Sequence, residues 1–283
     1  MDKKRKCVIV LGASSDIGAY VCRRYLEDGF RVLGTYRHFS KQVKALESAK
    51  GMMLLSCDVE KEKDIGRLVG FIKKNKFVWD TFFSAVGTTE PIGRFFELPF
   101  KKWEKTVHVN ALGQLRLLHA LHPYRAQQKT VDVVFLAGGG TNNPFRCYSA
   151  YCLGKIMLIK MCELLDDENT HLKVFIIGPG FVRTKTHQET LRAGKAAEGN
   201  YQKVQKWLQD KNAGTPMEDI YACIRWAQKQ ERRVVGGRNF SVVHDLWGEE
   251  ELTRQLARDG DMYKLRRSKN DWSQGGTRHA EKR

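Results

Sequence analysis

The segment that decides the fold reads Cys7-Val8-Ile9-Val10-Leu11-Gly12-Ala13-Ser14-Ser15-Asp16-Ile17-Gly18. Its first five residues are apolar and mostly β-branched, which is typical of a strand buried on both faces. An amphipathic stretch over residues 17–28 follows and indicates a helix. Glycines between such a strand and such a helix let the backbone approach a phosphate at the positive end of the helix dipole. We therefore expect a phosphate-binding turn made of Gly12, Ser14, Ser15, Asp16, Ile17 and Gly18.

Further short apolar runs alternate with helical patterns along the chain. We expect the other strands at Arg31–Tyr36, Gly51–Cys57, Phe77–Phe83, Val131–Ala137, Lys173–Gly178 and Asn239–His244. Apolar strands separated by helices predict a Rossmann-like, doubly wound α/β fold, with a mostly parallel seven-stranded sheet and helices on both faces. Its ligand binds at the carboxyl ends of the strands. We expect one domain over residues 1–263 and a basic, disordered tail over residues 264–283.

The composition is that of an ordinary globular protein: 42% of the 283 residues are hydrophobic and 29% are charged. This excludes collagen-like and wholly disordered chains. No apolar run approaches the roughly 18 residues of a membrane span. The N-terminal apolar run ends at a glycine loop without a cleavage site, so we interpret it as a strand and expect a cytoplasmic protein with no membrane partner. The seven cysteines never form CxxC and the histidines are not paired, so we expect reduced cysteines and no metal.

The formal net charge of +17 suits an anionic small molecule, a nucleic acid or an acidic membrane surface. Aromatic residues are not interleaved with the basic runs, which argues against nucleic acid as a partner. Residues 181–214 carry a net charge of +4 and show no strand pattern. We interpret them as a lid over an anionic substrate, with a solvated helical hairpin as the alternative. After them, Thr215-Pro216-Met217-Glu218 predicts a helix with Thr215 as its N-cap and Glu218 closing a capping box.

Two further motifs point to chemistry. Tyr36-Arg37-His38 ends the second predicted strand, where an acidic residue would bind the ribose of NAD. Since Arg37 can instead pair with a 2′-phosphate, we expect NADP(H) to be preferred over NAD(H). Tyr151 and Lys155 stand four residues apart, on one face of a helix. We expect the ammonium to lower the pKa of Tyr151 towards neutrality, so that the phenol can act as a general acid or base.

These motifs resemble, from residue 7 to about residue 245, the short-chain dehydrogenase/reductase family. Along the chain, the motifs that carry the resemblance are the glycine turn, Asp58-Val59, Ala85-Val86-Gly87, Asn110, Tyr151 with Lys155, and Pro179-Gly180-Phe181-Val182-Arg183-Thr184. The resemblance implies that Asp58 contacts the adenine, that Gly87 lets the backbone pass the cofactor, and that Asn110 kinks its helix and holds a water. It also implies that Lys155 binds the nicotinamide ribose, that Val182 holds the carboxamide and that Thr184 holds a phosphate. Homodimers or homotetramers, packed through the helices that bear Asn110 and Tyr151, are implied as well.

The sequence departs from the family pattern at three places. Asp16 replaces a glycine, which is tolerable if its side chain points to solvent or caps the helix. Ser84-Ala85-Val86 replaces Asn-Asn-Ala, which removes amide hydrogen bonds. Gly138 stands where the family has its substrate-binding serine, which removes a donor to the developing oxyanion. We expect Thr141 to take over this catalytic role; Asn142, a hydroxyl of the substrate and a loss of catalysis are the alternatives.

The function implied is an NADP(H)-dependent oxidoreductase that interconverts a carbonyl and an alcohol, with Tyr151 as general acid/base. A weaker likeness to enzymes of bacterial surface-polysaccharide or nucleotide-sugar pathways, carried by Tyr148–Glu168, Gly178–Glu189 and Gly237–Asp245, implies a nucleotide-linked ketosugar as substrate. The alternatives are a catalytically impaired NADP(H)-binding regulator or scaffold, and a nucleotide-sugar epimerase or dehydratase.

Overall fold

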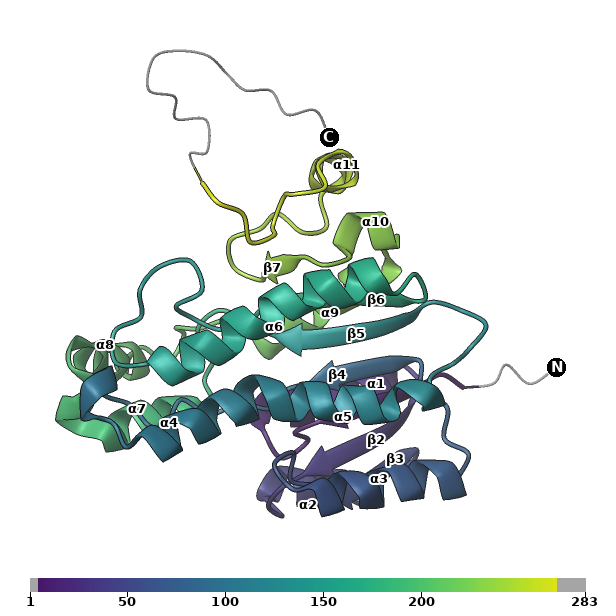
Figure 1. The fold of residues 1–283 in the computed structure, drawn as a ribbon, viewed down its shortest axis with the longest axis horizontal. Helices are drawn as coiled ribbons and strands as arrows, with labels where there is room; N and C mark the ends of the chain where they lie inside the picture. Colours follow the sequence, from purple (N-terminus) through teal and green to yellow (C-terminus); the bar gives the residue numbers. More distant parts are fainter. Residues whose placement is uncertain (1–4, 269–283) are drawn as a thin grey trace, which may run out of the picture.

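The strand Cys7–Leu11 (β1) lies inside a seven-stranded sheet in the computed structural model, which describes residues 5–268 (Figure 1). The other strands are β2 (Arg31–Tyr36), β3 (Met52–Ser56), β4 (Thr81–Ser84), β5 (Val131–Leu136), β6 (Leu172–Gly178) and β7 (Asn239–Ser241). Their order is β3-β2-β1-β4-β5-β6-β7, and every adjacent pair is parallel. Strand order reverses between β1 and β4, which creates a crevice at their carboxyl ends. The predicted doubly wound fold is confirmed.

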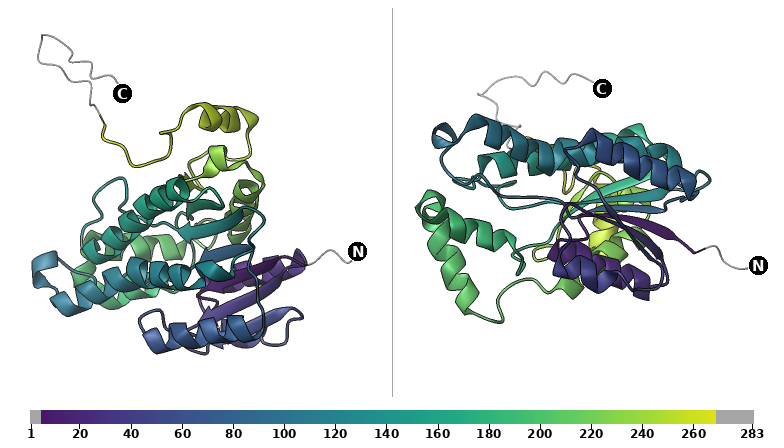
Figure 2. Two further views of the ribbon diagram at one scale, coloured as in Figure 1. Left: turned by 45° about the vertical axis from the view of Figure 1, so that its right-hand side comes forward. Right: turned by 90° about the horizontal axis from the view of Figure 1, so that it is seen from below.

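Helices cover both faces of the sheet (Figure 2). They are α1 (Asp16–Glu27), α2 (Lys41–Leu46), α3 (Glu62–Lys74), α4 (Phe100–Val107), α5 (Gly113–Leu121), α6 (Ser149–Glu168), α7 (Thr186–Ala193), α8 (Gly199–Gln209), α9 (Met217–Lys229), α10 (Arg232–Val235) and α11 (Glu250–Arg258). Short 3-10 turns are η1 (Phe95–Glu97), η3 (His122–Tyr124) and η4 (Gly194–Ala197), and η2 (His108–Leu112) is a π-turn.

Two apolar cores hold the layers together, and β1 contributes to both. Val8 and Val10 pack with α1 and α9 on one face, whereas Ile9 and Leu11 pack with α3, α5 and α6 on the other. This division follows from the alternation of side chains along a strand. Each of these four side chains is fully buried, which stabilises the fold by about 1.5–3 kcal/mol per side chain.

Some predicted boundaries are wrong because a contact with a distant segment or a local turn decides them. We predicted a strand from Phe77, but β4 begins at Thr81, since the Trp79 amide donates instead to the carbonyl oxygen of Tyr124. The last strand ends at Ser241 rather than at residue 244 because the Ser241 amide donates to the carboxylate of Asp245 and starts a turn. The strand predicted over residues 51–57 is one residue shorter at each end.

The capping box predicted for Thr215 and Glu218 is also wrong. Helix α9 begins at Met217, its N-cap is Pro216, and no side chain caps it. The carboxylate of Glu218 instead accepts a hydrogen bond from the hydroxyl of Tyr20 on α1 (3.1 Å). This contact ties α9 to α1 on the same face of the sheet.

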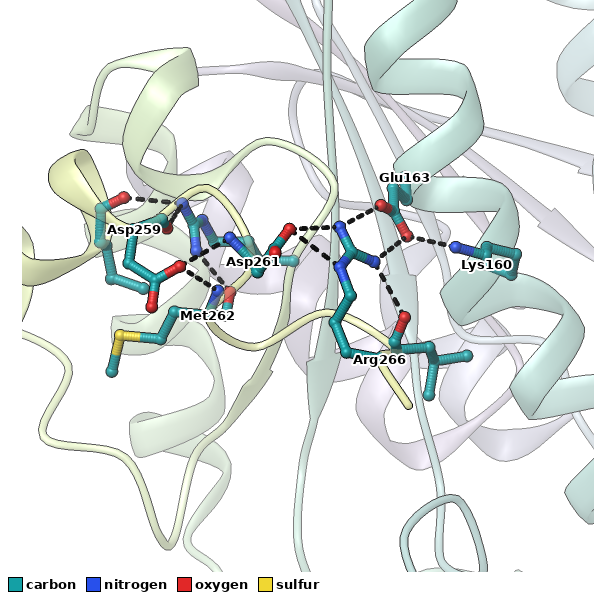
Figure 3. A network of polar contacts seen from close by, with 9 residues as sticks. Lys160, Glu163, Asp259, Asp261, Met262 and Arg266 are labelled. Carbon is teal, nitrogen blue, oxygen red and sulfur yellow. Dashed lines mark hydrogen bonds and ion pairs between the residues drawn. The ribbon is translucent and has the colours of Figure 1, made fainter. Parts of the chain in front are cut away.

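The segment after α11 returns to α6 through a network of polar contacts (Figure 3). Arg266 donates to Glu163 at 2.7 Å, and Lys160 pairs with the same carboxylate at 2.7 Å. The guanidinium of Arg266 lowers the pKa of Glu163 to about 2. The predicted disorder of the tail over residues 264–283 stays a prediction: residues 264–268 lie in the described part of the chain, and residues 269–283 lie outside it.

The segment over residues 181–214, called the lid below, folds into α7, η4 and α8. It lies beyond the carboxyl ends of the strands (Figures 1 and 2). Among residues 5–268, no helix is both long and apolar enough to cross a membrane.

Candidate active site

A cleft of about 300 Å³ opens at the carboxyl ends of β1, β2, β3 and β4. It is lined by Gly12, Ser14, Ser15, Thr35, Tyr36, Arg37, Cys57, Asp58, Val59, Ala85, Val86, Gly87, Thr88, Glu90, Val109, Glu189 and Arg192. Ten of the predicted cofactor-binding residues are among them: Gly12, Ser14, Ser15, Tyr36, Arg37, Asp58, Val59, Ala85, Val86 and Gly87.

The glycine turn at the floor of this cleft is closed by its own hydrogen bonds. The Ser15 hydroxyl donates to the Gly12 carbonyl oxygen (2.8 Å) and accepts from the Gly18 amide (3.0 Å), which caps α1. Gly12 has a φ of +81°, and a β-carbon on Gly18 would overlap the Gly12 carbonyl oxygen, so both positions require glycine. The positive end of α1 therefore lies at the cleft, next to Gly12, Ser14 and Ser15 of its lining, as phosphate binding requires. Ile17 instead packs against the core.

Asp16 neither points only to solvent nor caps the helix, which corrects our expectation. Its carboxylate accepts hydrogen bonds from the side-chain amide of Gln42 (2.8 Å) and from the backbone amide of Lys185 (3.0 Å). Lys185 belongs to the lid, so Asp16 joins the glycine turn to the start of α7.

The end of β2 presents a cation to the cleft. Arg37 is exposed, and Tyr36 beside it is partly buried. Asp58 begins the loop after β3, where its side chain accepts from the amide of Glu60 (3.1 Å). The arrangement leaves Arg37 accessible to an anionic group in the cleft.

The loss of the family asparagine at Ser84 is compensated from α5. The Ser84 hydroxyl donates to the side-chain oxygen of Gln114 (2.6 Å). The amide of Gln114 donates to the carbonyl oxygens of Val86 (3.3 Å), Val109 (3.1 Å) and Asn110 (2.7 Å). Gln114 thus holds the loop after β4 against the π-turn η2.

Asn110 lies within η2 and is fully buried. Its side chain accepts from the Thr88 amide (3.1 Å) and donates to the Thr88 carbonyl oxygen (2.8 Å). A β-carbon on Gly87 would lie 3.0 Å from the side-chain oxygen of Asn110 and 3.6 Å from Nζ of Lys155. The helix irregularity predicted at Asn110 is present, and Asn110, Gly87 and Lys155 meet in one place.

Tyr151 and Lys155 occupy the first two turns of α6. Nζ of Lys155 lies 5.8 Å from the centroid of the Tyr151 ring and donates to the carbonyl oxygen of Leu136 (2.8 Å). Lys155 is only 4% exposed, and this burial lowers its pKa from 10.5 to about 8.

The predicted fall in the pKa of Tyr151 is wrong for this structure. Desolvation of the partly buried Tyr151 phenol raises its pKa above its usual range, and the neighbouring Cys152 and the charge of Glu189 add to the rise. The sequence placed the phenol and ammonium on one helix face, but Lys155 directs its hydrogen bond to Leu136. The phenol is therefore held protonated here.

Gly138, at the position of the missing serine, faces the phenol directly. A β-carbon on Gly138 would overlap the hydroxyl oxygen of Tyr151. The Thr141 hydroxyl donates to the carbonyl oxygen of Gly138 at 3.4 Å. Tyr151 thus uses the space that a side chain at position 138 would need, and Thr141 lies in the adjoining turn.

The segment over residues 179–184 connects β6 to the lid. Gly180 has a φ of +75°, and a β-carbon there would overlap the hydroxyl of Thr215. Val182 is buried in the core, and its carbonyl oxygen accepts from the His187 ring (2.7 Å). Pro179, Gly180, Val182 and Thr184 are not among the residues that line the described cleft, so their cofactor contacts stay predictions.

Sequence reasoning missed residues that complete the cleft wall. Thr88 follows Gly87 directly, and its position could have indicated it. Glu189 and Arg192 come from α7, about a hundred residues further along the chain. The signal for Glu189 was that it is one of only three acidic residues in a basic lid.

The donor set of the cleft fits a nicotinamide dinucleotide. The glycine turn offers a helix N-terminus for a pyrophosphate, and Arg37 offers a cation at the end of β2. Asn110 and Lys155 lie beside Gly87, and the ring of Tyr151 lies next to Lys155, although none of the three is among the residues that line the described cleft.

Comparisons with known proteins agree with this arrangement. The family described as short chain dehydrogenase matches residues 6–194. Dehydrogenase/reductase SDR family member 4 of Bos taurus is 25% identical over 185 residues, covering 63% of this chain and 66% of that protein. An NAD-dependent glycerol dehydrogenase of Listeria innocua is 23% identical over 240 residues, covering 84% of this chain and 92% of that protein.

Solved structures share the fold. The KRED1-Pglu enzyme superposes with a TM-score of 0.74 at 21% identity, covering 83% of this chain and 99% of that one. A short chain dehydrogenase of Shigella flexneri 2a complexed with NADP gives a TM-score of 0.69 at 20% identity, covering 84% and 96%. The chain belongs to the short-chain dehydrogenase/reductase family and is an NAD(P)-dependent oxidoreductase.

Proposed function

We propose that the protein interconverts a carbonyl and an alcohol with Tyr151 as general acid/base, and that it prefers NADP(H) to NAD(H). The observation that carries this proposal is that Asn110 and Lys155 lie beside Gly87, which lines the cleft, and that Lys155 in turn lies next to the ring of Tyr151. Hydride transfer is the chemistry that a nicotinamide dinucleotide supplies when bound.

The chain's own residues handle the proton. During reduction, Tyr151 gives its hydroxyl proton to the carbonyl oxygen, and during oxidation it takes the proton from the alcohol. Lys155, with a pKa of about 8, is charged at neutral pH and can also release a proton near it. Two hydrogen bonds to the backbone of Thr88 hold the side chain of Asn110, which suits a role in orienting a water between Lys155 and solvent.

The preference for NADP(H) rests on Arg37. Its guanidinium can pair with a 2′-phosphate in a bidentate fork, and Tyr36-Arg37-His38 contains no carboxylate to repel that phosphate. Since the Listeria relative is named NAD-dependent and the Shigella neighbour was solved with NADP, the relatives leave both cofactors open. The ratio of dissociation constants for NADPH and NADH, measured by titration, tests the preference.

For the substrate, we propose a nucleotide-linked ketosugar. Arg192 lines the cleft and pairs with the exposed carboxylate of Glu90 (3.1 Å), which an anionic substrate could displace. Screening 4-keto and 3-keto nucleotide sugars for NADPH oxidation, beside simple ketones, tests this class. Turnover of neutral ketones alone would contradict it.

The structure also favours one alternative, an NADP(H)-binding regulator with little turnover. The Gly138 position lacks a hydroxyl, and burial raises the pKa of the Tyr151 phenol. Tight NADPH binding without oxidation by any carbonyl in the screen would support this alternative.

We further propose a homodimer or homotetramer, as is typical of the family. Apolar side chains are exposed along the helices that bear Asn110 and Tyr151 and just before them: Phe95, Phe96, Phe100, Leu112 and Leu153. Phe96 is 96% exposed, which is costly for an isolated chain. Sedimentation velocity on the full chain tests the assembly, and a monomer at all concentrations would contradict it.

A further inference from the structure

Helix α7 of the lid carries a carboxylate that faces inward, to the loop after β4. One oxygen of Glu189 accepts hydrogen bonds from the backbone amide of Thr89 (2.6 Å) and from its hydroxyl (2.6 Å). The other oxygen accepts from the hydroxyl of Thr88 (3.2 Å). Thr89 is 4% exposed, so these are short, charge-assisted bonds in a largely dry setting.

The same loop residues hold Asn110. The side chain of Asn110 accepts from the backbone amide of Thr88 at 3.1 Å and donates to the carbonyl oxygen of Thr88 at 2.8 Å. A continuous chain of hydrogen bonds therefore runs from Glu189 through Thr88 to the buried π-turn η2. Its links join segments about a hundred residues apart in sequence.

Thr190, the residue after Glu189, contacts the segment that leads into α6. The hydroxyl of Thr190 is 2.8 Å from the hydroxyl of Tyr148, and both side chains are buried. Tyr148 directly precedes α6, which bears Tyr151. Two consecutive residues of α7 thus contact the two segments that hold Asn110 and Tyr151.

A second carboxylate of the lid, Glu198, lacks this connection. Glu198 pairs with Arg94 (2.6 Å) and Arg146 (3.4 Å), and both arginines are exposed. Glu198 belongs to the lid as Glu189 does and is likewise a paired carboxylate, but its partners do not touch η2. It therefore offers a matched comparison.

We propose that Glu189 is a positioning residue that couples the closed position of α7 to Asn110 through Thr88 and Thr89. When α7 is closed, the carboxylate fixes the Thr88 peptide, and that peptide fixes the side chain of Asn110. When α7 moves away, the Thr89 amide loses its acceptor and Asn110 loses a rigid partner. The assignment rests on the proposed function, because it takes Asn110 to belong to the active site.

Hydrogen exchange of the full chain, without coenzyme or substrate, tests this coupling directly. Four proteins are compared: the wild type, Glu189→Ala, Glu189→Gln and the control Glu198→Ala. Loss of a charge-assisted hydrogen bond predicts exchange about tenfold faster at residues 88–89 and 108–112 in Glu189→Ala. Glutamine keeps an acceptor for Thr89, so Glu189→Gln is expected to restore exchange to within about threefold of the wild type. Glu198→Ala is expected to speed exchange in the lid and near Arg94 and Arg146, and to leave residues 108–112 unchanged.

The proposal is overturned if Glu189→Ala loosens α7 but leaves exchange at residues 108–112 unchanged, or if Glu198→Ala changes that segment equally. Should Glu189→Ala fail to fold, Thr89→Val replaces it, since this variant removes one donor and keeps the side-chain volume. Exchange at residues 108–112 is again expected to become faster. Unchanged exchange at these residues again contradicts the coupling. Because no turnover enters the measurement, its result is independent of whether the proposed oxidoreductase activity is found.

With a substrate in hand, the same variants give a second readout. Mispositioning of Asn110 predicts that Glu189→Ala lowers kcat about tenfold, with recovery in Glu189→Gln. A change confined to KM would mean that Glu189 only holds the lid, and would count against the coupling.

Discussion

Replacing Lys155 by methionine should make the pH dependence of stability less steep. Lys155 is 4% exposed, its ammonium donates to the carbonyl oxygen of Leu136, and burial lowers its pKa from 10.5 to about 8. Folding therefore disfavours the charged form of this lysine. Methionine has nearly the same length and carries no charge, so Lys155→Met removes the buried charge and leaves the packing largely intact.

The magnitude follows from linkage between protonation and folding. Between its two pKa values Lys155 binds more protons in the unfolded chain than in the folded one, so the stability of the wild type rises with pH in that window. With pKa values of 10.5 and about 8, the charged lysine costs about 3 kcal/mol near pH 7 and about 1.4 kcal/mol near pH 9.5. The stability of the wild type relative to Lys155→Met should therefore increase by about 2 kcal/mol over this range.

Urea unfolding at the two pH values, followed by circular dichroism, measures this difference. The control is Lys160→Met on the same helix, which removes an exposed lysine rather than a buried one. A difference between wild type and Lys155→Met that stays constant with pH, or that falls as pH rises, would refute the assignment of Lys155 as a buried, destabilised cation.

Three further variants test the site. Gly138→Ser should lower turnover at least tenfold and destabilise the fold by about 1–3 kcal/mol, because its β-carbon would displace the Tyr151 hydroxyl. Initial rates and thermal melting measure the two effects. Higher activity than the wild type would show that a serine is tolerated at this position. Arg37→Ala should weaken NADPH binding about tenfold and leave NADH binding nearly unchanged, as measured by titration; an unchanged ratio would show that Arg37 does not bind the 2′-phosphate. Thr141→Val should reduce kcat about tenfold if its hydroxyl replaces the missing serine, and a neutral result in steady-state kinetics would reject that role.

Local sequence predicted the fold well because the strands of a buried parallel sheet are uniformly apolar runs. Strand β1 and the glycine turn after it need no distant information, since Gly12 and Gly18 are required by their own backbone geometry. The start of β4 and the end of β7 were predicted poorly. A distant partner decides the first, and a turn closed by Asp245 decides the second. The Trp79 amide bonds to Tyr124, and this pairing leaves no trace in the local pattern.

The candidate site was predicted where its residues follow strands. Gly12 and Arg37 come directly after a strand, and Gly87 lies in the loop that follows β4; parallel strands end at one edge of the sheet, so these residues had to meet in one cleft. Glu189 was not predicted because its partners Thr88 and Thr89 lie about a hundred residues away.

Charge states were the weakest part of the sequence-based reasoning. Helical spacing placed Tyr151 near Lys155 but could not indicate that the ammonium donates to Leu136 or that burial dominates the pKa of the phenol. Asp16 shows the same limit: its role became visible only with the lid residue Lys185 beside it.

One measurement tests the catalytic proposal most directly: NADPH oxidation and NADPH binding, compared between the wild type and Tyr151→Phe with a carbonyl substrate found by screening. Losing the phenolic proton while keeping the ring should abolish turnover and leave the dissociation constant for NADPH within about twofold. Undiminished turnover in Tyr151→Phe would show that another group transfers the proton, and the proposed mechanism would be wrong.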